Sequence, residues 1–381
     1  VYVGSDATLY KNSAVNENKL SEELITKLGL SIEYVDTDVV LTFDNTYFAT
    51  SANKAIEFDA EKSAKLMLKA GTTSRIATTY NDGGCDICTQ GNLTIDGYGK
   101  LILDSIYSDN EGTSWKYGID VGYLCINRGN IVLQGLDNNK NLVGINTSET
   151  IINGGNIEIN GGKNVDIIYG MNTASDIIIN GGNINIDIDY TKAEGAISSE
   201  AYGIKVNALS TQSRILGGIT TIDISGTPTT AVGIYSNYDL DIENGTCEIV
   251  ADKLFDGNIN IIGNDVSISK AKNSSNEDVP TPSVSDISFY KYARIEPNYY
   301  YIYRDGKLYR SNASGTEVTV PGCSVNNSGE LVLDEFYFTT SNNYALCLES
   351  DTVVKVEDNH DYVETTTKRE VIAPTKPLTK E

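Results

Sequence analysis

The segment 151–159, IINGGNIEI, recurs at 177–186 as IIINGGNINI, and this pair decides the fold. In both copies isoleucine alternates with glutamate or asparagine after an Asn-Gly-Gly-Asn turn. Alternation with a period of two predicts β-strands that have one buried face and one wet face. Asparagine and glycine tolerate the left-handed backbone of tight turns, so each copy predicts two short strands joined at a turn.

A longer repeat surrounds these segments. Its marker is a glycine followed by an apolar residue, with separations of 26, 26, 33 and 30 residues. The copies are Gly118-Ile119, Gly144-Ile145, Gly170-Met171, Gly203-Ile204 and Gly233-Ile234. Units of this length cannot bury their apolar residues alone but can do so by stacking as coils. We therefore predict an all-β, right-handed parallel β-helix, in which equivalent residues of successive coils lie above one another.

The predicted stacking is specific. The apolar residues of the repeated dipeptides should form one column inside the solenoid. Asn130, Asn156 and Asn183 should stack at one turn, where each side-chain amide can bond to the next coil.

The chain divides into five predicted parts. We expect an N-terminal strand and capping helix over 1–37, the parallel β-helix over 38–272, a linker over 273–286, a Tyr-rich β region over 287–361 and a linker-like tail over 362–381. The apolar spacing of residues 19–28, with Gly29 following, indicates the short capping helix. Residues 47–58 resemble 337–348, so the Tyr-rich region is expected to begin a second module of a tandem array.

Composition narrows the class of partner. Aspartate and glutamate number 52 against 29 lysines and arginines, for a net charge of −23, so nucleic acid would be repelled. The sequence contains no run of 18 apolar residues, so it predicts no transmembrane segment. The chain opens on Val1 without a leader, and we expect an excerpt of a longer secreted or cell-wall attached protein.

Several kinds of catalytic and metal chemistry require residues that the repeats do not contain. The single histidine, His360, leaves no catalytic triad or HExxH zinc site in the repeats. Cys85 and Cys88 form a CxxC pair, but no second pair lies at zinc-finger spacing, so metal or redox chemistry is not expected there. Between residues 75 and 270 the arginines that could act as a lyase base are Arg75, Arg128 and Arg214.

Two pairs of aspartates deserve comparison. Asp187 and Asp189 lie two residues apart on one predicted strand face, and so do Asp239 and Asp241, which places each pair about 6.6 Å apart. Three interpretations stay open: a solvated acidic face, a Ca²⁺ site, or the carboxylate pair of an inverting glycosidase.

Aromatic residues mark the predicted ligand site. Tyr117, Tyr169 and Tyr202 each precede the repeated glycine and should form a ladder, which either packs beside the core or faces outward to stack on sugar rings. The loops between coils should project from one edge, and they carry Tyr107, Tyr190 and the only tryptophan, Trp115. Trp115 is the first choice for a ligand contact, with packing over its loop as the alternative.

Segments 91–101, GNLTIDGYGKL, and 152–159, INGGNIEI, resemble secreted β-helix proteins of anaerobic Gram-positive bacteria. Within that group the chain is similar to the carbohydrate-binding β-helix family related to polysaccharide lyases. The resemblance covers roughly residues 38–270. It implies an extracellular protein, and some members of the family bind acidic plant polysaccharide with Ca²⁺.

The sequence therefore favours an extracellular carbohydrate-binding or adhesion module of a tandem-repeat bacterial surface protein. Its expected partner is a polysaccharide or a host or cell-surface glycan, with Ca²⁺ as a candidate cofactor. Two alternatives remain: a polysaccharide lyase or hydrolase that uses carboxylates such as Asp187 and Asp189, and a structural or protein-binding stalk.

Overall fold

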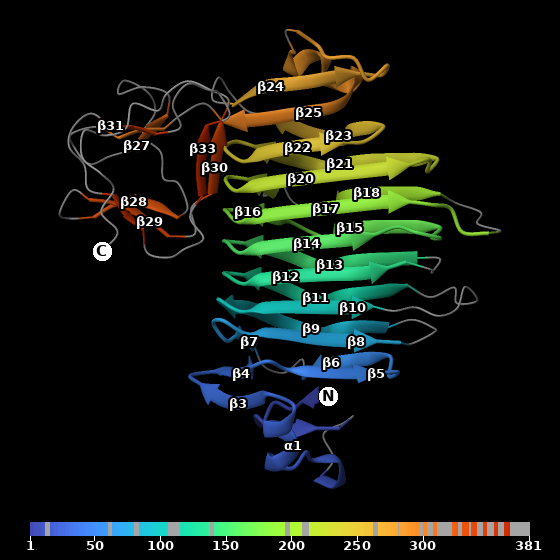
Figure 1. Cartoon of the computed structure of the whole chain (residues 1–381), viewed down its shortest axis with the longest axis vertical. Coiled ribbons are helices and arrows are strands. Elements are labelled where there is room, and N and C mark those ends of the chain that lie inside the picture. Colours follow the sequence, from blue (N-terminus) through green and yellow to red (C-terminus); the bar gives the residue numbers. More distant parts are fainter. Residues whose placement is uncertain are drawn as a thin grey trace.

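The computed structural model is a tall stack of parallel coils, with the N-terminal helix at one end (Figure 1). It describes residues 1–11, 16–59, 63–79, 84–105, 115–137, 141–194, 199–207, 213–261, 266–280 and 282–297, and beyond these 300–302, 308–310, 322–326, 330–334, 337–340, 346–348, 354–356 and 362–365. The prediction of a parallel β-helix is confirmed.

Each coil runs through three faces. Faces 1 and 2 belong to one 15-stranded sheet, because several strands bend around the corner between them, and face 3 is a 10-stranded sheet. Strand β9 (Gly84–Gly97) shows the bend, since its first part pairs with β6 and its second part with β7. In the repeated coils face 1 contains 84–88, 116–121, 141–147, 167–173, 200–206, 230–236 and 253–257, and face 2 contains 92–97, 123–126, 149–152, 177–179, 213–215, 240–242 and 259–261.

The remaining strands of the 15-stranded sheet are β1 (Tyr2–Val3), β2 (Leu9–Tyr10), β3 (Leu30–Val35), β4 (Asp38–Phe43), β6 (Lys54–Phe58), β7 (Ala64–Leu68), β11 (Lys116–Ile126), β13 (Asn141–Ile152), β15 (Ile167–Thr173), β16 (Ile177–Ile179), β18 (Glu200–Val206), β19 (Ser213–Ile215), β21 (Thr230–Ile242) and β23 (Lys253–Ile261). Face 3 consists of β5 (Tyr47–Thr50), β8 (Thr73–Thr78), β10 (Lys100–Ser105), β12 (Asn130–Leu136), β14 (Asn156–Gly161), β17 (Asn183–Tyr190), β20 (Ile219–Gly226), β22 (Thr246–Val250), β24 (Val266–Asn273) and β25 (Tyr290–Pro297).

The repeated glycine marks a bend in face 1 where two successive residues face inward. Gly203 and Ile204 are both buried, whereas Tyr202 before them and Lys205 after them point outward. A Cβ atom on Gly203 would lie 2.5 Å from Cγ2 of Ile222 and 2.6 Å from a backbone oxygen of the next coil. A side chain at Gly203 would clash with the core and with the next coil, so only glycine fits there. The bend at this residue brings face 1 close to face 3.

The predicted inner column is present in strand register. Ile119, Ile145, Met171, Ile204 and Ile234 are paired in that order through β11, β13, β15, β18 and β21. Each of these side chains is at most 2% exposed. Burial of an isoleucine side chain contributes roughly 1.5–3 kcal/mol, so columns of this kind hold the coils together.

The asparagine turn lies between face 2 and face 3, and it departs from the prediction in one respect. Asn130, Asn156 and Asn183 stack in register as expected. The bonds between side-chain amides, however, run through the residues three positions earlier, with Asn153 Nδ2 donating to Asn127 Oδ1 at 2.8 Å. Asn180 Nδ2 donates in turn to Asn153 Oδ1 at 2.7 Å. Asn127, Asn153 and Asn180 each directly follow the last residue of face 2 in their coil. Their side-chain amides therefore face each other from coil to coil.

Both ends of the stack are covered. The predicted capping helix is α1 (Glu22–Lys27), preceded by the 3₁₀ helix η1 (Asn16–Asn18), and its N-cap Ser21 accepts a hydrogen bond from Leu24 N at 3.3 Å. Gly29, with φ +70°, ends it as expected. At the other end β25 pairs antiparallel with β22 and β24, after the 3₁₀ helix η2 (Val284–Phe289). An antiparallel strand ends the parallel stacking there.

The strands after residue 297 repeat the pairing pattern of the first strands of the chain. They are β26 (Tyr300–Ile302), β27 (Leu308–Arg310), β28 (Cys323–Val325), β29 (Leu331–Leu333), β30 (Tyr337–Thr340), β31 (Leu346–Leu348), β32 (Val354–Val356) and β33 (Tyr362–Thr365). Strand β26 pairs antiparallel with β27 and parallel with β31, as β1 does with β2 and β6. Strand β29 pairs antiparallel with β28 and parallel with β32, as β4 does with β3 and β7. Strands β30 and β33 pair parallel, as β5 and β8 do.

Local details of the two regions also agree. The φ angle is +71° at Gly322 and +70° at Gly29. The backbone nitrogen of Asp334 donates to Gly322 O at 2.9 Å, and that of Asp44 donates to Gly29 O at 2.9 Å. The sequence similarity of 47–58 with 337–348 thus extends to a shared pattern of strand pairing.

Neighbouring isoleucines in β16 test the inward and outward alternation. Ile179 is fully buried in the core, whereas Ile178 faces outward and is only half-buried. Ile179→Ala leaves a cavity and should lower the free energy of unfolding by about 2–5 kcal/mol. Ile178→Ala is the matched control and should cost less than about 1.5 kcal/mol. Urea unfolding followed by circular dichroism measures both, and equal losses would contradict the assigned register.

Candidate ligand-binding face

Face 1 presents two outward columns of side chains along the solenoid. Because the bend turns two successive residues inward, each coil gives one residue to each column, three positions apart. Column 1 contains Lys54, Cys85, Tyr117, Val143, Tyr169, Tyr202, Val232 and Lys253, and column 2 contains Glu57, Cys88, Asp120, Asn146, Asn172, Lys205, Tyr235 and Asp256.

Contacts within a coil link the two columns. At the N-terminal end Lys54 Nζ lies 2.6 Å from Glu57 Oε1, and at the C-terminal end Lys253 Nζ lies 3.5 Å from Asp256 Oδ2. Cys85 and Cys88 are joined by a disulfide. Ion pairs at both ends thus flank a central stretch of aromatic and amide side chains.

The aromatic side chains form a continuous run over face 1. The ring centroids of Trp115 and Tyr169 are 5.4 Å apart, those of Tyr169 and Tyr202 are 5.3 Å apart, and those of Tyr202 and Tyr235 are 6.0 Å apart. Val143 lies in register between Tyr117 and Tyr169 and is 1% exposed, so neighbouring side chains cover it. The tyrosine pairs meet edge to face, a preferred arrangement of aromatic rings.

Lys205 fixes the centre of this run. Its Nζ lies 4.3 Å from the ring centroid of Tyr169 and 4.7 Å from that of Tyr202, and it donates to Tyr169 Oη at 2.9 Å. Burial lowers the pKa of the Lys205 amine, and the neighbouring Glu200 opposes that shift. A cation held between two rings keeps both in place.

An amide ladder runs beside the rings in column 2. Asn172 Nδ2 donates to Asn146 Oδ1 at 2.8 Å, and Asn146 Nδ2 donates to Asp120 Oδ1 at 2.8 Å. Asn207 Nδ2 continues the ladder by donating to Asn172 Oδ1 at 3.2 Å. An amide has two donor hydrogens and two acceptor lone pairs, so each asparagine keeps bonding capacity beyond the ladder.

The predicted aromatic residues divide between this face, the core and the undescribed part of the chain. Tyr117, Tyr169 and Tyr202 lie in column 1, and Trp115 contacts that column. They face outward but are largely covered: Tyr169 is 8% exposed and the other three are half-buried. The ladder therefore faces outward and is largely covered, and its stacking on sugar rings stays a prediction. Tyr107 lies outside the described residues.

Tyr190 requires a correction. It is 2% exposed and belongs to the core, and its hydroxyl donates to the backbone oxygens of Val165 and Asp166 at 3.0 and 3.1 Å. Tyr190 stands at an inward position of β17, so it closes the interior of the coil and offers no surface to a ligand. Alternation in β17 would have identified this position.

Sequence reasoning missed Lys205 and Tyr235. Both follow the repeated glycine by two residues, at the outward position of column 2. The signal that would have found them is the spacing of three between outward residues on either side of the inward pair.

The two predicted aspartate pairs lie on different faces. Asp187 and Asp189 are exposed on face 3, where Asp189 Oδ2 lies 3.6 Å from Lys163 Nζ. Asp239 lies at the corner of β21 and Asp241 on face 2, where Asp241 Oδ1 accepts from Asn260 Nδ2 at 3.0 Å. Within the described residues, no group of three or more histidine, cysteine, aspartate or glutamate side chains is placed to hold a metal ion.

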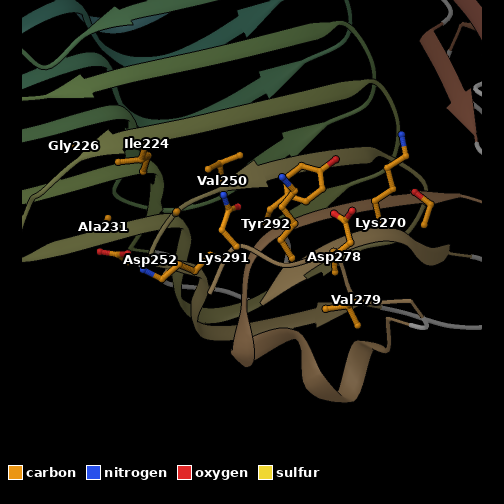
Figure 2. Close-up of a pocket in the computed structure, with 15 residues that line it drawn as sticks. Ile224, Gly226, Ala231, Val250, Asp252, Lys270, Asp278, Val279, Lys291 and Tyr292 are labelled. Atoms are coloured by element: carbon orange, nitrogen blue, oxygen red, sulfur yellow. Dashed lines mark hydrogen bonds and ion pairs between the residues drawn. The ribbon is translucent and has the colours of Figure 1, made fainter. Parts of the chain in front are cut away.

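A pocket lies at the C-terminal end of the solenoid, beside the last coil (Figure 2). Its volume is about 760 Å³. The walls come from β20, β21, β22, β24 and β25 and from the turns after β22 and β24. Lys270, Asp278 and Lys291 lie around it, with Tyr292 between them (Figure 2).

Comparisons with known proteins add no family. A scan against protein-family models, a search of curated proteins and a search of solved structures found no match to this chain. None of the helices in the described part of the chain has the length and apolar character of a membrane span.

A buried carboxyl group lies beneath the disulfide. Asp86 takes the inward position that glycine occupies in later coils, and it is fully buried. Its Oδ1 accepts from Thr78 Oγ1 at 2.6 Å and its Oδ2 from Ser105 Oγ at 2.5 Å. Burial raises the pKa of Asp86 to about 7, and the two hydroxyl donors oppose this shift.

The raised pKa of Asp86 predicts a pH-dependent stability. Between pH 3.8 and about 7 the folded state binds a proton that the unfolded state has lost, so rising pH destabilises the fold. The slope is at most about 1.4 kcal/mol per pH unit. The asparagine of Asp86→Asn does not titrate. The free energy of unfolding of the variant, relative to the wild type, should therefore increase as the pH rises through this window, as measured by urea unfolding. The exposed Glu158→Gln is the control. A stability difference that does not change with pH would contradict the assignment.

Proposed function

We propose that this chain is an extracellular carbohydrate-binding module and that the two columns of face 1 form its binding surface. The observation that carries the proposal is the run from Trp115 through Tyr169 and Tyr202 to Tyr235, beside the amide ladder of column 2. Sugars stack their apolar ring faces on aromatic side chains and bond through their hydroxyls to amides and carboxylates. Face 1 offers both groups side by side.

The shape of the surface favours a linear polymer. The columns run along the solenoid, and each coil adds the same two positions at a parallel strand spacing of about 4.8 Å. A chain that lies along the axis would meet several coils at once. The net charge of −23 opposes polyanions at long range, so a neutral polysaccharide or host-cell glycan fits this face better.

Two further observations support an extracellular array. The Cys85–Cys88 disulfide is of a kind that persists in oxidising compartments. The pairing pattern of β1 to β8, repeated by β26 to β33, supports a tandem arrangement of such modules. Repeated weak sites on one protein raise avidity, which suits adhesion to a polymer or a cell surface. Ca²⁺ binding remains a prediction and enters the test below.

Binding is favoured over a lyase because the arginines of the coils are engaged. Arg75 pairs with Asp104, Arg128 Nε lies 2.8 Å from Asp96 Oδ1, and Arg214 Nε lies 3.9 Å from Glu243 Oε1. A lyase needs a free base beside the substrate to remove a proton. A protein-binding stalk is the remaining alternative, supported by the same tandem pattern.

Affinity electrophoresis in gels that contain a panel of polysaccharides tests the proposal. We expect at least one polysaccharide to retard the protein without release of product. Trp115→Ala and Tyr202→Ala should each weaken the retardation about tenfold, because each removes a stacking surface. Tyr47→Ala removes a tyrosine that is 63% exposed on face 3, so it is the matched control and should leave the retardation unchanged.

Parallel gels with Ca²⁺ and with chelator show whether the ion takes part. Unchanged migration in every gel would argue for the protein-binding stalk, and product release would argue for the enzyme. Equal losses for Tyr202→Ala and Tyr47→Ala would remove face 1 as the site.

A further inference from the structure

We propose that the pocket at the C-terminal end of the solenoid is a second binding site, distinct from the aromatic run of face 1, and that it takes the carboxylate of an acidic sugar. The juxtaposition that carries this inference is three lysines around one apolar floor, in a chain that otherwise has a large excess of acidic residues.

The pocket has the size and lining of a small-molecule site. Its volume of about 760 Å³ lies within the usual range of ligand pockets, roughly 300–1,000 Å³. Ile224, Val250 and Val279 supply apolar surface, and Tyr292 adds an aromatic wall (Figure 2). Val250 is 36% exposed at an outward position of β22, so its side chain is open to an occupant.

The charges of the lining leave a local excess of cations. Lys291 Nζ is engaged by Asp252 Oδ1 at 2.7 Å. Lys270 and Lys272, both on β24, form no ion pair with any described residue, and Asp278 is the one other carboxylate in the lining. The lining therefore has three ammonium groups against two carboxylates, whereas the whole chain has 52 acidic against 29 basic residues.

The rim of the pocket is preformed. Asn273 Oδ1 accepts from the backbone nitrogens of Ser275 and Glu277 at 2.9 and 3.0 Å, which fixes the turn after β24. Val279 N then donates to Ala271 O at 2.9 Å and closes the turn over the pocket. Tyr292 Oη is held by Glu248 Oε1 at 2.9 Å. Binding on a rigid rim costs little ordering entropy.

These features fit a ring with one acidic substituent. The ring would lie against Val250 and Tyr292, and its carboxylate would meet Lys270 and Lys272. Lysine ammonium groups bind carboxylates as point charges and keep their attraction best where water is partly excluded. A neutral sugar of the same shape would lack this attraction to the two lysines and should bind more weakly.

Isothermal titration of the full chain with glucuronate, at low ionic strength, tests the site. We expect saturable binding, with glucose bound at least about tenfold more weakly. The double variant Lys270→Ala/Lys272→Ala should lose about tenfold in affinity for glucuronate. Lys163→Ala/Lys192→Ala, on the same edge of earlier coils, removes the same charge and should bind as the wild type does. Circular dichroism verifies that each variant is folded.

Val250→Tyr separates the pocket from general electrostatic attraction. It fills the floor without a change of charge and should abolish binding of glucuronate. Trp115→Ala should leave that binding intact, because Trp115 is not part of the pocket lining, so the two proposals can fail independently. The inference is overturned if the wild type shows no saturable binding, if glucose binds as tightly, if the two double variants lose affinity equally, or if Val250→Tyr binds normally.

Discussion

In the five coils that carry the repeated glycine, the outward columns of face 1 depend on the close approach of backbone to core at that residue. At Gly203 the neighbouring coil and the side chain of Ile222 leave no room for a Cβ atom. The inward turn of two successive residues then sets the outward residues of face 1 three apart in each coil. Parallel register repeats that arrangement from coil to coil, so the same backbone path serves both the packed interior and the aligned aromatic and amide side chains.

The fold was predictable because its signals are local and repeated. Alternation of isoleucine with polar residues, and the recurring glycine, predicted the coils and the inner column that the strand registers show. The candidate site was only half predictable. Tyr169 and Tyr202 followed from the repeat, but Tyr190 was assigned to the surface, although alternation in β17 places it inside. Lys205 and Tyr235 were missed because alternation with a period of two does not continue across the bend at the repeated glycine, and the pocket because five strands contribute to its lining.

The two proposed sites use different physics on one scaffold. On face 1 the rings of Tyr169 and Tyr202 are held by Lys205, so recognition would come from stacking and from the amide ladder, with little net charge. At the C-terminal pocket Lys270 and Lys272 would give recognition through charge. A rigid solenoid keeps both surfaces at fixed separation, and repetition of the module would repeat the pair along an array.

The most direct test of the central claim uses the single tryptophan, Trp115, as a reporter of face 1. Acrylamide quenching of its fluorescence would be measured with and without a polysaccharide that retards the protein. If that polymer lies along the aromatic run, it should shield the indole and lower the quenching constant. A polysaccharide that binds while the quenching constant stays unchanged would contradict the account, because its binding surface would then lie elsewhere on the solenoid.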